Sequence, residues 1–159
     1  MPLLTKDDIL PKTEYEKSRP EFRRRVMLDK SKRRVLVGEH CTVHFESRDT
    51  MLYQVQEMLR AEDSWDRPGA VEDELEAYNP LIPWSGELSA TIMFEYETVE
   101  ERAEFLPKFV GIERHVWLQV GDGDRLLAEF DRGQIDEHKV SSVQYIKWKL
   151  DDLRRELLK

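Results

Sequence analysis

Side chains able to bind a small molecule are concentrated between residues 46 and 79 of this 159-residue sequence. Guanidinium groups can grip a carboxylate or a phosphate, carboxylates can accept a proton, and phenol and amide groups can donate hydrogen bonds. This chemistry predicts a site for a small molecule or an anion, with enzymatic activity left open. The residues expected to bind the ligand are Glu46, Arg48, Tyr53, Gln56, Glu57, Arg60, Tyr78 and Asn79.

This hypothesis gives each chemical group a role. Arg48 and Arg60 would both hold the anionic group of the ligand, a glutamate of the set would act as a base, and a tyrosine would donate a hydrogen bond. All of these side chains must converge in one concavity. The sequence contains no Gly-x-Ser-x-Gly, phosphate-binding glycine loop, dinucleotide-binding fingerprint or His-Glu-x-x-His motif, so it names neither a reaction nor a cofactor.

Half of the predicted site lies on a helix expected from about residue 50 to residue 62, with Asp49 and Thr50 as its start signal. Its apolar residues recur at helical spacing and form one continuous stripe for the core. Tyr53, Glu57 and Arg60 stack on the opposite side, at spacings of four and three. That polar side is either an exposed face with a weak ion pair, or a second buried face that lies under the N-terminal segment or around a ligand.

A strand expected over residues 41–47 precedes this helix. Alternation places Cys41, Val43 and Phe45 on its core face. Cys41, the one cysteine of the chain, is therefore expected to be a small buried hydrophobic residue and not a nucleophile. A hairpin turn connects this strand to a short strand over residues 35–37.

A metal or haem site is a further alternative. Histidine nitrogen and carboxylate oxygen are common metal ligands. The candidates are His40, His44, Glu46 and His115. The other interpretation of the first three is the polar outer face of a sheet, and His115 shares a strand face with Trp117 that another element can cover.

The remaining pattern predicts an α+β fold in a single domain over residues 1–159, with about six mainly antiparallel strands and helices packed on one face. Residues 79–84 carry two prolines and four other residues, three of them apolar, and are expected to lie against the body across the edge of a pocket. Further strands are expected over residues 87–97, 114–120, 125–131 and 140–150, and helices over residues 18–33, 70–78, 98–110 and 151–158.

Charge is distributed unevenly along the chain. The formal net charge is −8, yet residues 1–34 carry 11 Lys and Arg against 6 Asp and Glu. This basic helical N-terminal segment is expected either to pack on the acidic body or to extend from it as a docking surface for an acidic partner. The negative net charge argues against nucleic acid as a partner.

The remaining composition bears on location. Apolar runs are far shorter than the roughly 20 residues of a membrane-spanning helix, so no membrane association is expected. The first residues show no secretory signal, and with one cysteine this favours a cytoplasmic location. The oligomeric state is left open.

Five segments resemble, in the same order, a bacterial family known as domain of unknown function 3501. They are Glu14-Tyr15 with Arg19-Pro20-Glu21-Phe22-Arg23, Phe45-Glu46-Ser47-Arg48-Asp49-Thr50, Tyr53-Gln54-Val55-Gln56-Glu57-Met58-Leu59-Arg60, Glu76-Ala77-Tyr78-Asn79-Pro80-Leu81-Ile82-Pro83, and Gly111-Ile112-Glu113. The resemblance covers nearly the whole chain and implies no particular activity. Genes of this family often neighbour those of a rubrerythrin-like protein and an iron–sulfur oxidoreductase. The resemblance therefore implies an accessory or interaction protein with redox partners, although one cysteine cannot hold an iron–sulfur cluster.

Overall fold

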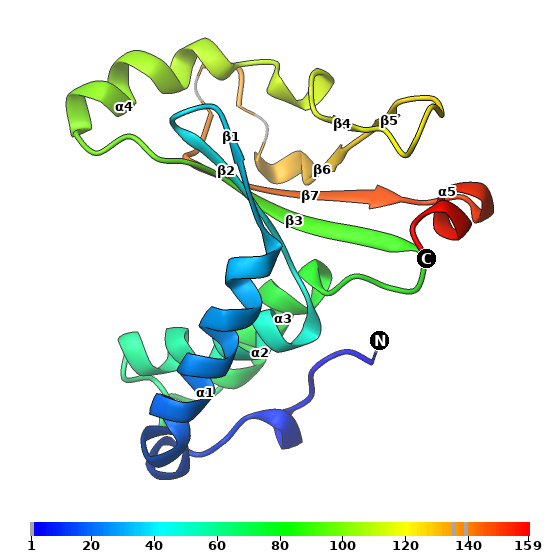
Figure 1. Cartoon of the computed structure of the whole chain (residues 1–159). Coiled ribbons are helices and arrows are strands. Elements are labelled where there is room, and N and C mark those ends of the chain that lie inside the picture. The colour runs from blue at the N-terminus through cyan, green and yellow to red at the C-terminus, as the bar shows by residue number, and fades with distance from the viewer. Residues whose placement is uncertain (1, 135, 139) are drawn as a thin grey trace. The chain divides into compact units, whose positions relative to one another are not determined.

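Two compact units make up the chain, and each is built from two separate stretches of sequence. Unit 1 comprises residues 1–33 and 46–83, and unit 2 comprises residues 34–45 and 84–159. The computed structural model describes residues 2–134, 136–138 and 140–159 (Figure 1). Each unit has its own cluster of buried apolar side chains. The prediction of one domain spanning residues 1–159 stays a prediction.

Unit 1 is helical. Its elements are η1 (Lys6–Asp8), α1 (Lys12–Arg33), α2 (Arg48–Ala61), α3 (Ala70–Tyr78) and η2 (Asn79–Leu81), where η denotes a 3-10 helix. The apolar stripe predicted for α2 is confirmed, since Met51, Val55 and Leu59 are at most 3% exposed. They pack with Leu75 of α3 and with Ile82. Burying a side chain of this size contributes about 1.5–3 kcal/mol, so this stripe is a main source of the unit's stability.

The predicted helix over residues 18–33 is wrong at its start, because α1 begins at Lys12 and continues through Pro20. Proline lacks the N–H and crowds the preceding turn, which costs about 3 kcal/mol inside a helix. Tyr15 and Arg19, before the proline, both donate hydrogen bonds to Glu57 of α2. Val26, after it, is 2% exposed. Tertiary contacts on both sides therefore hold one helix together across the proline.

The start signal of α2 lies two residues earlier than predicted. Ser47, and not Asp49, is the cap: its side chain accepts a hydrogen bond from the Thr50 N–H at 3.2 Å. In return, the Ser47 N–H donates to the Thr50 hydroxyl at 2.9 Å. This reciprocal capping satisfies two backbone N–H donors that would otherwise be buried without a partner.

Unit 2 contains a five-stranded antiparallel sheet with strand order β1-β2-β3-β7-β6. Its register places Val35 opposite Val43, Val37 opposite Cys41, and Val43 opposite Ile92. Residues directly opposite each other share a face. Cys41, Val43 and Phe45 on the predicted core face of β2 are half-buried and pack against the core of unit 2, while Thr42 on the other face is 1% exposed. The strands are β1 (Arg34–Val37), β2 (Cys41–Phe45), β3 (Glu87–Phe94), β6 (Glu129–Phe130) and β7 (Val143–Lys149).

A second, two-stranded sheet and short helices complete unit 2. The predicted hairpin around residues 121–124 is confirmed as β4 (Trp117–Leu118) and β5 (Leu126–Leu127). The other elements are α4 (Val99–Phe105), η3 (Leu106–Phe109), η4 (Ile112–Arg114), η5 (Arg132–Gln134) and α5 (Asp152–Leu157). Antiparallel sheets together with separate helices confirm the α+β class. Among the described residues, no helix combines the length and the apolarity needed to cross a membrane.

Candidate functional site

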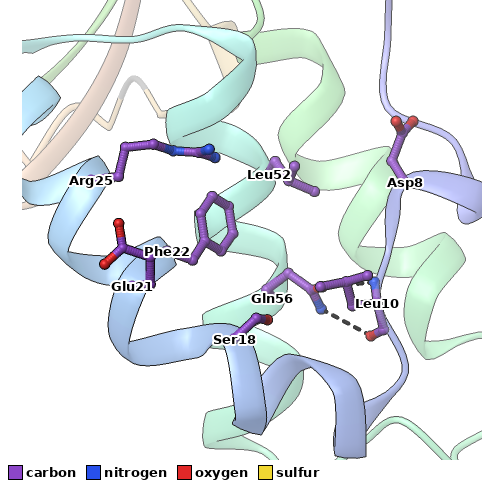
Figure 2. Close-up of a pocket in the computed structure, with 8 residues that line it drawn as sticks. All are labelled: Asp8, Leu10, Ser18, Glu21, Phe22, Arg25, Leu52 and Gln56. Carbon is purple, nitrogen blue, oxygen red and sulfur yellow. Dashed lines mark hydrogen bonds between the residues drawn. The ribbon is translucent and has the colours of Figure 1, made fainter.

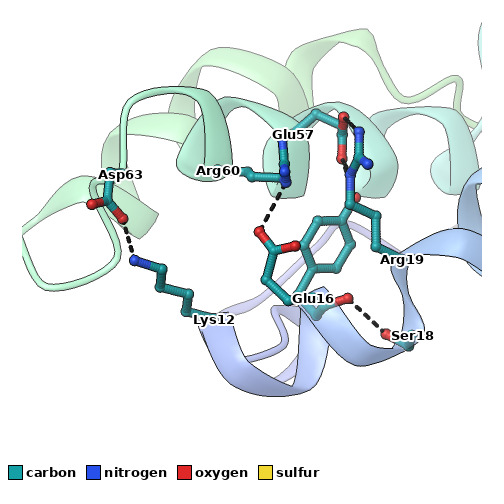
Figure 3. A network of polar contacts seen from close by, with 8 residues as sticks. Lys12, Glu16, Ser18, Arg19, Glu57, Arg60 and Asp63 are labelled. Atoms are coloured by element: carbon teal, nitrogen blue, oxygen red, sulfur yellow. Dashed lines mark hydrogen bonds and ion pairs between the residues drawn. The ribbon is translucent and has the colours of Figure 1, made fainter.

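The polar side of α2 faces α1, and Glu57 is the centre of the contact (Figure 3). Arg19 donates two parallel hydrogen bonds to its two carboxylate oxygens, each 2.8 Å long. The Tyr15 hydroxyl donates a third, at 2.6 Å. The Arg19 guanidinium, followed by the Tyr15 hydroxyl, lowers the pKa of Glu57 to about 2, although burial opposes this. Glu57 is therefore a fixed anion in this structure and is poorly suited to act as a base near neutral pH.

Two amide side chains hold the backbone that precedes α1. Gln56, 1% exposed, accepts from the Leu10 N–H at 2.8 Å and donates to the Leu10 carbonyl at 3.3 Å. Asn79 does the same for Leu4, with hydrogen bonds of 2.8 and 2.9 Å. Each amide thus pairs with the N–H and the C=O of one backbone residue, as a neighbouring β-strand would. The amide oxygen and one amide N–H of each side chain are therefore occupied by the N-terminal segment.

Arg48 and Arg60 lie at opposite ends of α2. Arg48 bonds to the Asp8 carboxylate at 2.6 Å, and this contact holds the pKa of Asp8 below its usual value. Arg60 bonds to Glu16 at 2.8 Å, where both side chains are about two-fifths exposed. Twelve residues at 1.5 Å rise each separate the two arginines by about 18 Å along the helix axis. The expectation that both grip one anionic group is therefore not met by this geometry.

The other predicted residues also have local partners. Glu46, 7% exposed, accepts a hydrogen bond from the Thr50 hydroxyl at 2.6 Å. Tyr53 is equally buried and meets the ring of Phe22 edge-on, with centroids 5.9 Å apart. Burial, followed by the charge of Glu57, raises the pKa of Tyr53. Tyr78 packs half-buried against the core of unit 1.

The geometry thus supports one of the two alternatives for the polar side of α2: it is a second buried face, and the N-terminal segment covers it. Its ion pairs, which also include Lys12 with Asp63 at 2.5 Å, join α1 to α2 and the turn after α2 (Figure 3). Ligand binding by the eight predicted residues stays a prediction. Residues 79–84 contribute Leu81 and Ile82 to the core.

A hollow of about 410 Å³ remains in unit 1 beside this contact (Figure 2). Phe22 and Leu52 supply its apolar lining, and Asp8, Glu21 and Gln56 supply polar groups. All three polar groups are already occupied, by Arg48, Arg24 and the Leu10 backbone respectively. A ligand that binds these three groups would have to displace an existing hydrogen bond or ion pair. Arg25 also lines the hollow, where its guanidinium lies over the Phe22 ring.

Unit 2 contains a larger and more apolar cavity of about 660 Å³, which we call the sheet cavity. This volume lies within the range of about 300–1,000 Å³ that is typical of small-molecule sites. Strands β1, β2 and β3 line it on one face of the sheet, and η3, η4 and β4 line it from above that face. Its lining includes Val37, Cys41, Val43, Ile92, Trp117 and Trp148.

Few polar groups line the sheet cavity. Trp148 is 4% exposed, and its indole N–H finds no acceptor among the described residues. A buried N–H without an acceptor costs about 1–3 kcal/mol, so such groups call for an explanation. Burial raises the pKa of the Cys41 thiol, which is therefore protonated near neutral pH. Exposed His40 and His115 complete the polar lining together with Glu39.

Sequence and structure comparisons identify the family. The family described as protein of unknown function (DUF3501) matches residues 3–159, essentially the whole chain. The chain belongs to the DUF3501 family. A crystal structure of a novel protein of unknown function from Burkholderia pseudomallei K96243 is 36% identical, with a TM-score of 0.91 over 99% of this chain and 82% of that one. No curated protein matches this chain.

This member of the DUF3501 family places only His40 and His115, of the residues considered for a metal or haem site, in the lining of the sheet cavity. His40 lines the sheet cavity and stacks on Tyr96, with centroids 4.8 Å apart. His44 lies on the opposite face of the sheet, where its Nε2 is 3.2 Å from the Thr42 hydroxyl. Within residues 2–134, 136–138 and 140–159, no three His, Cys, Asp or Glu side chains are grouped to hold a metal ion.

The sheet cavity was not predicted for this DUF3501 chain, although parts of its lining were. The core face of β2 and the shared face of His115 and Trp117 were both recognised from alternation. The sequence pattern could not show that Trp148 lies on the same side of the sheet as these residues. The β3–β7 register shows this, because it places Trp148 opposite Leu88. Trp148, a large apolar side chain between two lysines in β7, is a further sequence signal that points to this site.

Proposed function

We propose that this protein binds a small, flat, apolar molecule that carries a hydrogen-bond acceptor, and that the sheet cavity is its site. The observation that carries the proposal is a cavity of about 660 Å³ with a mostly apolar lining, to which Trp148 contributes; the Trp148 indole N–H is itself buried and has no acceptor among the described residues. The apolar lining would bury the molecule, and a rotation of the Trp148 indole toward the cavity would bring its N–H to an acceptor on the ligand.

The sheet cavity is favoured over the hollow of unit 1 for an energetic reason. Binding to Asp8 or Gln56 in the hollow displaces hydrogen bonds that these side chains already make. Binding in the sheet cavity displaces no hydrogen bond of the Trp148 indole, which has no acceptor among the described residues. Each net hydrogen bond contributes about 0.5–1.5 kcal/mol, and burial of apolar ligand surface contributes about 25 cal/mol per Å².

Calorimetric titration with naphthyl methyl ketone, a flat apolar probe with one acceptor, tests this proposal. Val43→Trp places a large side chain in the cavity and is expected to weaken binding at least tenfold. Met93→Trp is the matched control, because Met93 lies on the other face of the neighbouring strand and is 36% exposed. If Val43→Trp fails to fold, Val37→Trp replaces it in the titration, because Val37 also lines the cavity and is half-exposed. Equal binding by wild type and both cavity variants, or no binding at all, would overturn the proposal.

An accessory role beside cytoplasmic redox proteins is the second candidate. Its support is the family resemblance, which implies rubrerythrin-like and iron–sulfur oxidoreductase partners, together with exposed basic side chains along α1, among them Lys17, Arg23 and Lys32. These positions suit contact with an acidic protein surface. Pull-down from cell extract should recover redox proteins with wild type and lose them when the three residues are changed to glutamate. Repeated recovery of no redox protein would count against this role.

A further inference from the structure

Strand β1 has one open edge. It is the first strand of the sheet and pairs with β2 alone among the described strands. Val35, Leu36 and Val37 are 47%, 70% and 54% exposed. An exposed apolar edge presents unpaired N–H and C=O groups, which form a template for another strand. The question is which strand this edge fits.

The order of side chains on β1 suits pairing with the β1 strand of a second copy of the chain. In an antiparallel pair, residues directly opposite each other lie on the same face of the sheet. A two-fold axis through Leu36 and perpendicular to the sheet places Leu36 opposite the partner's Leu36, and Val35 opposite the partner's Val37. Apolar residues then meet apolar residues at all three positions, because Val-Leu-Val reads the same in both directions. The contact is isologous and closes at two copies.

Charge does not oppose this arrangement. The same register places Arg34 opposite the partner's Gly38, so the two arginines do not face each other. Arg34 also contacts the Glu95 carboxylate of its own chain at 3.2 Å, which compensates its charge within unit 2. An unrelated acidic peptide would gain no free cation at this edge, which favours a second copy as the occupant.

The pairing also bears on the sheet cavity. Val35 and Val37 line the cavity and belong to the open edge. In the register above, the partner's Val35 and Val37 continue the same face beyond β1. Two sheet cavities would then lie on the same face of one continuous sheet, and each would gain apolar wall from the other copy.

We infer that two copies of this chain associate through β1, antiparallel and centred on Leu36, and that the dimer completes the wall of each sheet cavity. The inference rests on the open edge and its side-chain order, and not on the proposed ligand. Its test therefore needs no ligand, and its failure is distinguishable from failure of the binding proposal.

Light scattering coupled to size-exclusion chromatography, over a series of protein concentrations, measures the association. Wild type is expected to dimerise, whereas Leu36→Asp and Leu36→Lys are each expected to be monomeric, because the axis sets like charges directly opposite each other. Mixing the two variants is expected to restore a one-to-one heterodimer, which native mass spectrometry identifies by mass. Leu153→Asp on α5 is the control, because Leu153 is also 70% exposed but lies away from β1.

Rescue by mixing requires both variants to be folded, so it separates loss of the contact from loss of structure. A monomeric wild type at all concentrations would overturn the inference. So would a Leu36→Asp variant that dimerises like wild type, or a mixture that contains no heterodimer.

Discussion

Replacing Glu57 with glutamine removes the charge at the centre of the α1–α2 contact. The pKa of Glu57 is about 2 in the folded protein, mainly because of Arg19, against about 4.3 in an unfolded chain. Because the folded pKa is the lower one, the carboxylate stabilises the fold fully above about pH 4.3, and this contribution is lost as pH falls through about 2. The difference between the two pKa values corresponds to about 3 kcal/mol. The side chains of Arg19 and Glu57 are 25% and 22% exposed, so solvent screening makes this an upper bound and we expect about 2–3 kcal/mol.

Urea unfolding followed by circular dichroism measures this effect, with wild type and Glu57→Gln compared from pH 7 down to pH 2. The stability difference should be largest at neutral pH and should disappear toward pH 2, while carboxylates common to both proteins cancel. Glu16→Gln is the matched control, because its pair with Arg60 is 43% and 41% exposed and should contribute less than about 1 kcal/mol. The reasoning is refuted if Glu57→Gln costs no more than Glu16→Gln, or if its cost does not depend on pH.

Two further substitutions and one labelling experiment test separate parts of the structure. Gln56→Leu leaves the Leu10 backbone without its amide partner, so we expect a loss of about 2 kcal/mol and faster hydrogen exchange at the Leu10 amide; unchanged exchange would contradict the contact. Pro20→Ala restores a helical donor at an exposed position, and should raise the unfolding free energy by about 1–3 kcal/mol in urea, whereas a loss would show that proline is needed there. Burial raises the pKa of Cys41, so Ellman's reagent at pH 8 should label folded protein more slowly than unfolded protein, and equal rates would refute this.

Local structure was predictable wherever a short-range rule decides it. The helix over residues 70–78 is observed as predicted, and the helix expected over residues 98–110 is observed as α4, capped by Thr98, followed by η3, which contains Pro107. The same rule misplaced the start of α1, because it treats a proline as a boundary. Contacts to Glu57, nearly forty residues away from Arg19, override that local preference.

The candidate sites depended on contacts that no short window contains. Spacing on α2 correctly stacked Tyr53, Glu57 and Arg60 on one side, and it allowed that side to be buried under the N-terminal segment. It could not show that the partners of Gln56 and Asn79 would be backbone groups of Leu10 and Leu4 rather than a ligand. The sheet cavity draws on residues from 35 to 148, so only the strand register brings it together.

The most direct test of ligand binding in the sheet cavity uses Trp148→Phe and two probes of nearly equal shape. Naphthyl methyl ketone carries an acceptor, and ethylnaphthalene does not. If the indole N–H donates to the acceptor, Trp148→Phe should lower the affinity for the ketone by about two- to tenfold, which corresponds to about 0.5–1.5 kcal/mol. The affinity for ethylnaphthalene should remain nearly unchanged. An equal loss for both probes, or no loss for either, would contradict the assignment of Trp148 as the donor to the ligand.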